Sequence, residues 1–506
     1  MIKIKKNARN YLIKYLKNRM ENRVKDWHKL WNYKSRYEEM SVGMKAALWY
    51  TVANFIQKGF VFLSTPILTR ILNVNDYGTL ILYQSWFVLF AIFATLNLSQ
   101  TAYNKGLVEF ENDKDNFTFS LLFLSKTITI IVAFLYFTFN ILVKDSTGLT
   151  PSFMIFLFSD ILFNISIEFY LARQRFEFKY RKAVLISTFS SFFIVAISTT
   201  ILLAIKNDLF IKIVLDAIIR IIFGLYCFYL LFFSGRRQLK IEKKYIKYGL
   251  SYSLPLIPHF LSHYILNQSD RLMINMFDGK EKLAIYSLAY SVSMIMFLFT
   301  NAINQSIMPH TFQALKKKDY CGIHGSTKWL FVVVGGITAL SILFAPELIV
   351  ILGGNKYKES IWLVPPIAIS VYFLFVYSMF SNISFYYKMN KLISLVSTGA
   401  ALSNIILNYI FINIFGYQAA AYTTLLCYIL LAFSHFFLYR FLLKKEEIHE
   451  ELYNMKMILI ISLILLIILF LILVIYNLAI IRYAIIAIIL FLLFTKRNKI
   501  ITSLKS

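Results

Sequence analysis

Residues 117–143 read FTFSLLFLSKTITIIVAFLYFTFNILV, and this stretch decides the fold class of the chain. It is long enough to cross a hydrocarbon core of roughly 30 Å as a helix, and it is too continuous for the core of a soluble domain. Residues 455–475, MKMILIISLILLIILFLILVI, have the same character. Fourteen such apolar stretches follow one another from about residue 46 to about residue 495. The sequence therefore predicts an all-α membrane protein with about 14 transmembrane helices.

The composition also argues for a membrane protein. Hydrophobic residues make up 58% of the chain and charged residues 16%, which is far from the balance of a soluble domain. The net charge of +27 invites comparison with nucleic-acid-binding proteins, but those carry their basic residues on one soluble face. Here the basic residues lie between membrane spans, so we expect no nucleic-acid partner.

The distribution of Lys and Arg predicts the orientation of the chain. With the amino terminus inside, about 27 of them fall in the inner loops and the carboxyl tail, against about 10 in the outer loops. Cytoplasmic loops of membrane proteins carry such an excess. We therefore expect both termini to be cytoplasmic.

The apolar stretches and the basic gaps divide the chain into five segments. Residues 1–43 carry twelve Lys and Arg against four acidic residues, and form either an interfacial helix on anionic lipid or a solvated basic tail. The other segments are an N-lobe of six helices (44–233), a cytoplasmic connector (234–247), a C-lobe of six helices (248–441) and a final helix pair with its tail (442–506).

The two lobes show weak internal similarity. Arg70 is followed by Asp76, Tyr77 and GTLILYQS, and Arg271 is followed by Asp278 and LAIYSLAYS. Each of these runs opens the second helix of its lobe, as a parallel duplication of a six-helix unit requires. The sequence thus predicts a pseudo-repeat.

Three motifs carry a resemblance to a known family: PILTRILNVNDYGTLILYQS (66–85), YGLSYSLPLIPHFLSHYILNQSDRLMI (248–274) running into AIYSLAYS (284–291), and LSNIILNYIFINIFGYQAAAYTTLLCY (402–428). With these motifs the chain resembles the Wzx-type oligosaccharide flippases of the multidrug/oligosaccharidyl-lipid/polysaccharide exporter superfamily. The resemblance covers about residues 44–440 and leaves out the basic tail.

The resemblance implies a two-lobed, V-shaped fold that moves undecaprenyl-diphosphate-linked oligosaccharide across the plasma (inner) membrane of a bacterium by alternating access. It also implies coupling to an ion gradient, contact with membrane lipids, and polysaccharide polymerase and chain-length proteins as partners. A cation-coupled multidrug exporter of the same superfamily is the alternative. An organic-cation exporter needs an acidic and aromatic cavity, whereas a flippase for an anionic lipid needs a basic one.

An enzyme is the least expected class, because the chain shows no Gly-rich phosphate loop, zinc motif or nucleophile elbow. A membrane glycosyltransferase or polymerase also needs a long outer loop. The one carboxylate pair with some likeness to a metal motif, Asp113 and Asp115, is expected to form a solvated acidic turn. Cys227, Cys321 and Cys427 lie far apart, so we expect no disulfide, no metal site and no cofactor.

Polar residues inside the spans are costly and mark candidate sites. The candidates for substrate contact in a central cavity are Lys58, Arg70, Arg220, His259, Asn267 and Arg271. Lys58 lies mid-span, where it either meets a phosphate or pairs with a carboxylate of another helix. Arg271 closes the seventh helix at the outer interface together with Asp270, where it either holds a diphosphate or acts as a structural clamp.

The candidates for ion coupling are Asp160, Glu168, Asp216 and Asp270. Asp160 and Glu168 lie with Asn164 on one stripe of the fourth helix, and they either bind a proton or sodium ion or pair with cations such as Lys58. Asp216 stands four residues before Arg220, so the two are expected to form a structural ion pair.

Two further features concern single helices. Pro255 and Pro258 predict a break in the seventh helix, where freed carbonyls could line a cavity and His259 could titrate. The final helix pair either forms a groove for the polyprenyl chain or simply faces lipid.

Overall fold

A computed structural model describes residues 37–38, 40–142, 147–204, 208–233 and 239–496. Most of the predicted basic tail, residues 234–238 of the connector and residues 497–506 lie outside this part. The interfacial helix predicted for the tail therefore also lies outside the described residues.

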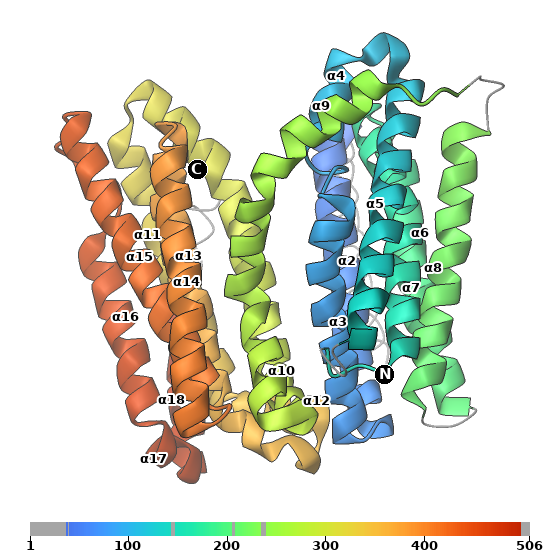
Figure 1. The fold of residues 1–506 in the computed structure, drawn as a ribbon. Helices are drawn as coiled ribbons and strands as arrows, with labels where there is room; N and C mark the ends of the chain where they lie inside the picture. The colour runs from blue at the N-terminus through green and yellow to red at the C-terminus, as the bar shows by residue number, and fades with distance from the viewer. Residues whose placement is uncertain (1–36, 39, 143–146, 205–207, 234–238, 497–506) are drawn as a thin grey trace, which may run out of the picture.

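Helices make up the two lobes and the terminal pair (Figure 1). The N-lobe contains α2 (Val42–Ile71), α3 (Val74–Thr95), α4 (Ala102–Glu109), η1 (Glu111–Asp113), α5 (Lys114–Leu142), α6 (Pro151–Phe176), α7 (Tyr180–Ala204) and α8 (Leu209–Phe232). The C-lobe contains α9 (Lys243–Ser253), η2 (Leu254–Leu256), α10 (Ile257–Lys317), α11 (Tyr320–Leu343), α12 (Ala345–Gly353), η3 (Asn355–Trp362), α13 (Val364–Tyr386), α14 (Asn390–Phe415) and α15 (Ala419–Lys445). The terminal pair comprises α16 (Met455–Phe470), α17 (Ile472–Asn477) and α18 (Ala479–Thr495).

Ten helices of the described residues are long and apolar enough to cross a membrane. One of them, α10, contains two of the predicted spans. They meet at Gly279, where the helix breaks with a φ of 84°, a backbone conformation that favours glycine. The helices α16 and α18 are apolar but shorter. The all-α membrane fold with two lobes and a terminal helix pair is thus confirmed.

The predicted break in the seventh helix is also confirmed. Residues Leu254–Leu256 form a 3₁₀ turn that separates α9 from α10. Pro255 lies in this turn and Pro258 lies at the start of α10. Pro removes a backbone donor and blocks the preceding helical turn, so α9 and α10 are separate helices that meet at an angle in Figure 1.

The two lobes contact each other along α3 and α10, and this contact includes the region where α2 turns into α3 and where α10 breaks at Gly279, here called the hairpin end. Thr69 Oγ1 donates to the Leu352 carbonyl at 2.5 Å, and the rings of Tyr77 and Tyr357 meet edge to face at 5.9 Å. A Cβ on Gly78 would lie 1.9 Å from the Lys280 carbonyl oxygen. Only glycine therefore allows this approach of the lobes.

The opposite end, where α4 and α9 lie, is here called the connector end (Figure 1). The predicted solvated acidic turn at this end is wrong, because both carboxylates are engaged. Asp113 accepts from the Tyr245 hydroxyl, and Asp115 pairs with Arg173 at 2.9 Å. The two aspartates anchor α9 and α6, so they have a structural role.

The terminal pair packs on α11. Gly335 and Gly336 of α11 let Ile461 and Leu493 approach closely. Arg482 of α18 pairs with Glu347 of α12. The Arg482 side chain is buried, and its ion pair with Glu347 offsets the cost of burying its charge.

Candidate functional site

Two pairs of opposite charges lie within the N-lobe helices. Asp160 of α6 accepts from the Tyr83 hydroxyl at 3.0 Å and lies 3.7 Å from Arg220 Nε of α8. The Arg220 guanidinium also covers the ring of Phe87 at 5.3 Å. Since each charge has a partner from another helix, this cluster binds α3, α6 and α8 together.

The predicted pair between Asp216 and Arg220 is wrong. Asp216 instead pairs with Lys212, one turn earlier on α8, at 2.6 Å. Asp216 has a basic residue four positions away on either side, Lys212 and Arg220. Because α6 packs against α8, Arg220 pairs with Asp160 instead, and Asp216 pairs with Lys212.

Glu168 is held by neutral donors. Ser99 donates to it at 2.7 Å and Asn164 at 2.9 Å. Ser99 belongs to the turn after α3, so the carboxylate ties this turn to α6. Among the described residues, no lysine or arginine lies within ion-pairing distance of Glu168, and Lys58 in particular does not pair with it or with Asp160.

Lys58 is exposed on α2. It stands eleven residues before Thr69, and eleven residues are almost three full helical turns, so both side chains lie on the same face of α2. Thr69 contacts the C-lobe at the hairpin end. Lys58 therefore lies on the face of α2 that carries Thr69, about 16 Å nearer the connector end.

Arg70 and Arg271 take part in packing contacts. Arg70 donates to the Pro66 carbonyl at 2.9 Å and across the lobes to the Ile351 carbonyl at 2.8 Å. Arg271 donates to Gln268 and lies 5.0 Å from the ring of Tyr290.

The predicted placement of Asp270 and Arg271 at the outer end of the seventh helix is wrong, because α10 continues to the break at Gly279. Asp270 is only 3% exposed and accepts from the Tyr286 hydroxyl. This carboxylate therefore lies within the lobe.

The C-lobe encloses a cavity of about 790 Å³ between α10, α13, α14 and α15. This volume falls within the roughly 300–1,000 Å³ of small-molecule sites. His259 and Asn267 line it. The other four candidates for substrate contact, Lys58, Arg70, Arg220 and Arg271, do not.

The basic lining predicted for a flippase cavity stays a prediction, because this cavity lies within the C-lobe. None of the described lining residues is Lys, Arg, Asp or Glu. Its polar groups are amides, hydroxyls and one histidine. Three of the amides, Asn301, Asn304 and Asn382, are not among the candidates predicted from the sequence. The two asparagines of TNAINQS, residues 300–306, are the sequence feature from which this site could be predicted. Only the fold shows that Asn304 contacts Asn382 of α13.

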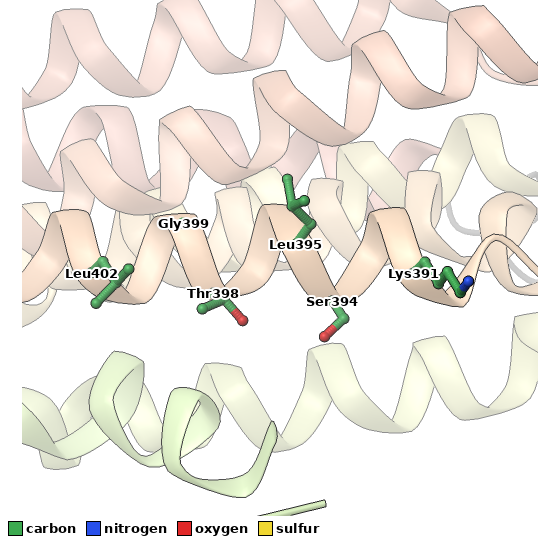
Figure 2. A pocket seen from close by; sticks show the side chains of 6 residues that line it. All are labelled: Lys391, Ser394, Leu395, Thr398, Gly399 and Leu402. Carbon is green, nitrogen blue, oxygen red and sulfur yellow. The ribbon is translucent and has the colours of Figure 1, made fainter. Parts of the chain in front are cut away.

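A groove of about 740 Å³ adjoins this cavity along α14 (Figure 2). Ser394 and Thr398 line both spaces, and Figure 2 shows their hydroxyls on the same side of the helix. The Ser262 hydroxyl of α10 lies 3.4 Å from that of Thr398. Lys391, one turn before Ser394, also lines the groove.

Two lobes of membrane-spanning helices in contact with each other, with a cavity inside the C-lobe, are the architecture of a membrane transporter. The family model described as polysaccharide biosynthesis protein matches residues 44–315, more than half of the chain. The chain belongs to this family. The MatE model matches residues 255–410.

Relatives in Haemophilus influenzae agree with this assignment. A protein of the Lsg locus is 26% identical over 365 residues, which are 69% of this chain and 86% of the relative. A second membrane protein of that organism is 24% identical over 380 residues, covering 70% of this chain and 89% of its own length.

Solved structures share the fold. The lipid II flippase MurJ in an inward closed conformation has a TM-score of 0.68 at 17% identity and covers 89% of this chain and 99% of its own. An inward-facing multidrug resistance MATE transporter has a TM-score of 0.59 at 13% identity and covers 80% and 100%. These likenesses support the fold and leave the substrate to the chemistry of the site.

Proposed function

We propose that this protein flips undecaprenyl-diphosphate-linked oligosaccharide across the bacterial plasma membrane by alternating access. The observation that carries the proposal is Lys58, an exposed cation of α2 on the helix face that carries Thr69, which contacts the C-lobe. A diphosphate needs such a cation, because an unpaired anion in a membrane interior is costly. The family's assignment to polysaccharide biosynthesis supports the same substrate class.

The described lining of the C-lobe cavity has neither the carboxylates of an organic-cation exporter nor the basic residues of a site for an anionic lipid, so the preference for a flippase rests on Lys58. A cation exporter needs carboxylates that face its cavity, but the described lining contains none. Asp160 and Asp216 are already occupied by Arg220 and Lys212. Asp160 and Asp216 therefore stabilise the N-lobe through ion pairs and are not free to bind a cationic ligand.

Glu168 and Asp270 are the residues that we expect to bind the coupling ion. Both carboxylates accept hydrogen bonds from neutral donors, so neither has to break an ion pair in order to take up a proton or sodium ion. Basic residues near the connector end, among them Arg173 and Lys391, support a cytoplasmic position for that end, because cytoplasmic loops carry an excess of Lys and Arg. The polysaccharide polymerase and chain-length proteins are the expected partners.

Transport by the full chain in vesicles tests the proposal. Lipid-linked oligosaccharide is supplied on one face, and its sugar is scored on the other. Lys58→Ala should reduce the rate at least tenfold and Lys58→Arg should retain most of it, while Lys356→Ala, at an exposed lysine of η3, serves as control. Transport of ethidium without transport of the lipid-linked glycan would instead establish the multidrug exporter.

A further inference from the structure

The C-lobe cavity has an unusual chemical character for a site in a membrane. Its described lining combines amides and hydroxyls with aromatic rings, and it contains no charged side chain. Its polar members include His259, Asn267, Asn304, Asn382, Ser394 and Thr398. Such a lining offers many hydrogen bonds and no countercharge.

The amides retain capacity for a ligand. Asn382 of α13 donates to the Asn304 carbonyl of α10 at 2.8 Å. An amide carries two donor hydrogens and a carbonyl with two acceptor sites, so this bond uses only part of either side chain. Asn382 is 2% exposed, and its contact with Asn304 orients both groups on the cavity wall.

Aromatic rings complete the lining. Phe297, Tyr377, Phe385 and Tyr428 come from three different helices. A sugar ring has one face of C–H groups that packs on an aromatic ring and a rim of hydroxyls that both donate and accept hydrogen bonds. Amides and aromatic faces in one cavity match both parts of such a ring.

Because the described lining has no charged side chain, the cavity favours uncharged ligands over ions. An ion enters a site of low dielectric constant only at a cost of several kcal/mol unless a partner charge meets it. Uronic acids, phosphates and organic cations are therefore disfavoured in this cavity. An uncharged sugar brings no such cost.

From these features we propose that the C-lobe cavity binds uncharged sugar units, hexose or N-acetylhexosamine, of the transported glycan. The proposal rests on the proposed function and extends it by naming the sugar class and the place where it binds. Lys391 lies in the adjoining groove, on the same helix as Ser394 and Thr398 (Figure 2). It supplies a cation outside the neutral cavity that attracts the anionic lipid-linked substrate.

Photo-crosslinking of the full chain in lipid nanodiscs tests the proposal. The probe is N,N′-diacetylchitobiose that carries a diazirine, and mass spectrometry locates the labelled residues. We expect labels on α10, α13 and α14 around the cavity, and we expect excess unlabelled chitobiose to compete at least tenfold better than digalacturonate. Labelling elsewhere, or equal competition by digalacturonate, would overturn the proposal.

Variants separate a sugar site from general damage. Ser394 is exposed, so Ser394→Trp fills the entrance without repacking a core and should reduce labelling at least tenfold. Ile406→Trp, at an exposed site farther along α14, should leave labelling within twofold. Lys391→Ala should leave labelling unchanged but slow transport of the lipid-linked glycan.

The outcomes also distinguish this inference from the proposed function. If wild-type protein transports the glycan but the probe labels residues outside the cavity, the sugar site is wrong and the flippase stands. If the probe labels the cavity but no glycan is transported, the flippase is wrong and the chain still contains a neutral sugar site.

Discussion

The N-lobe and the C-lobe share a six-helix plan but use their polar residues differently. In the N-lobe, Asp160 and Arg220 form a buried ion pair between helices, and Lys212 and Asp216 form a second pair along α8. In the C-lobe, amides such as Asn304 and Asn382 surround a cavity. The comparison teaches that a polar residue in a span is no guide to a binding site until its partners are known.

The largest effect should come from breaking an N-lobe pair. Asp160→Ala leaves Arg220 in the span without its carboxylate, and loss of one partner of a buried pair costs about 3–5 kcal/mol. We expect the free energy of unfolding in detergent to fall by that amount, together with the abundance of the protein in membranes. A loss below about 1 kcal/mol would show that this pair does not hold the lobe together.

The contact between the lobes should give the next largest effect. Gly78→Val places side-chain atoms against the Lys280 carbonyl, and such overpacking costs about 1–3 kcal/mol. The hairpin end should therefore open. In a background without the exposed Cys321, Leu352→Cys should react faster with an impermeant maleimide when Gly78→Val is also present.

Gly59→Val is the matched control for this change. Gly59 lies on α2, and a Cβ there meets nothing within 4 Å. Equal labelling rates in the Gly78 and Gly59 variants would mean that the close approach at the hairpin end does not control access.

A smaller effect on stability is expected in the C-lobe. Asn304→Ala removes the hydrogen bond from Asn382, which is worth about 1 kcal/mol. Transport of lipid-linked glycan should nevertheless fall severalfold, because the amide serves the ligand. If this variant lost as much stability as Asp160→Ala and kept its transport rate, the contrast between the lobes would be refuted.

The smallest effect concerns pH at the connector end. Burial opposes ionisation of Glu177, but hydrogen bonds from Arg173 and Lys179 outweigh it and lower its pKa to about 2. Because this pKa is depressed, the contribution to stability is present above the ordinary value of 4.5 and is lost as the pH falls toward 2.

Partial solvent exposure limits this contribution to less than about 1 kcal/mol. Glu177→Gln should flatten the acid limb of the melting temperature between pH 4.5 and 2 by that small amount. Glu111→Gln, at another acidic residue of the connector end, is the control. If Glu177→Gln and wild type lose melting temperature equally between pH 4.5 and 2, the contacts of Glu177 with Arg173 and Lys179 do not contribute to stability.

Several features followed from local sequence. The break near Pro255 was predictable because proline disrupts its own helix regardless of tertiary context. The partner of Arg220 was not predictable, because the i, i+4 rule offers Asp216 and only the packing of α6 on α8 offers Asp160. The placement of Asp270 failed for a related reason, since nothing local shows that the helix continues to Gly279.

That the chain is a bundle of membrane helices with two similar lobes follows from its apolar stretches and repeated motifs, which are properties of the sequence. Which intramembrane charges cancel, and where a neutral cavity remains, depends on how the helices pack. A charge or an amide inside the bundle is neutralised or hydrogen-bonded by groups from other helices, and those groups lie far away in the sequence.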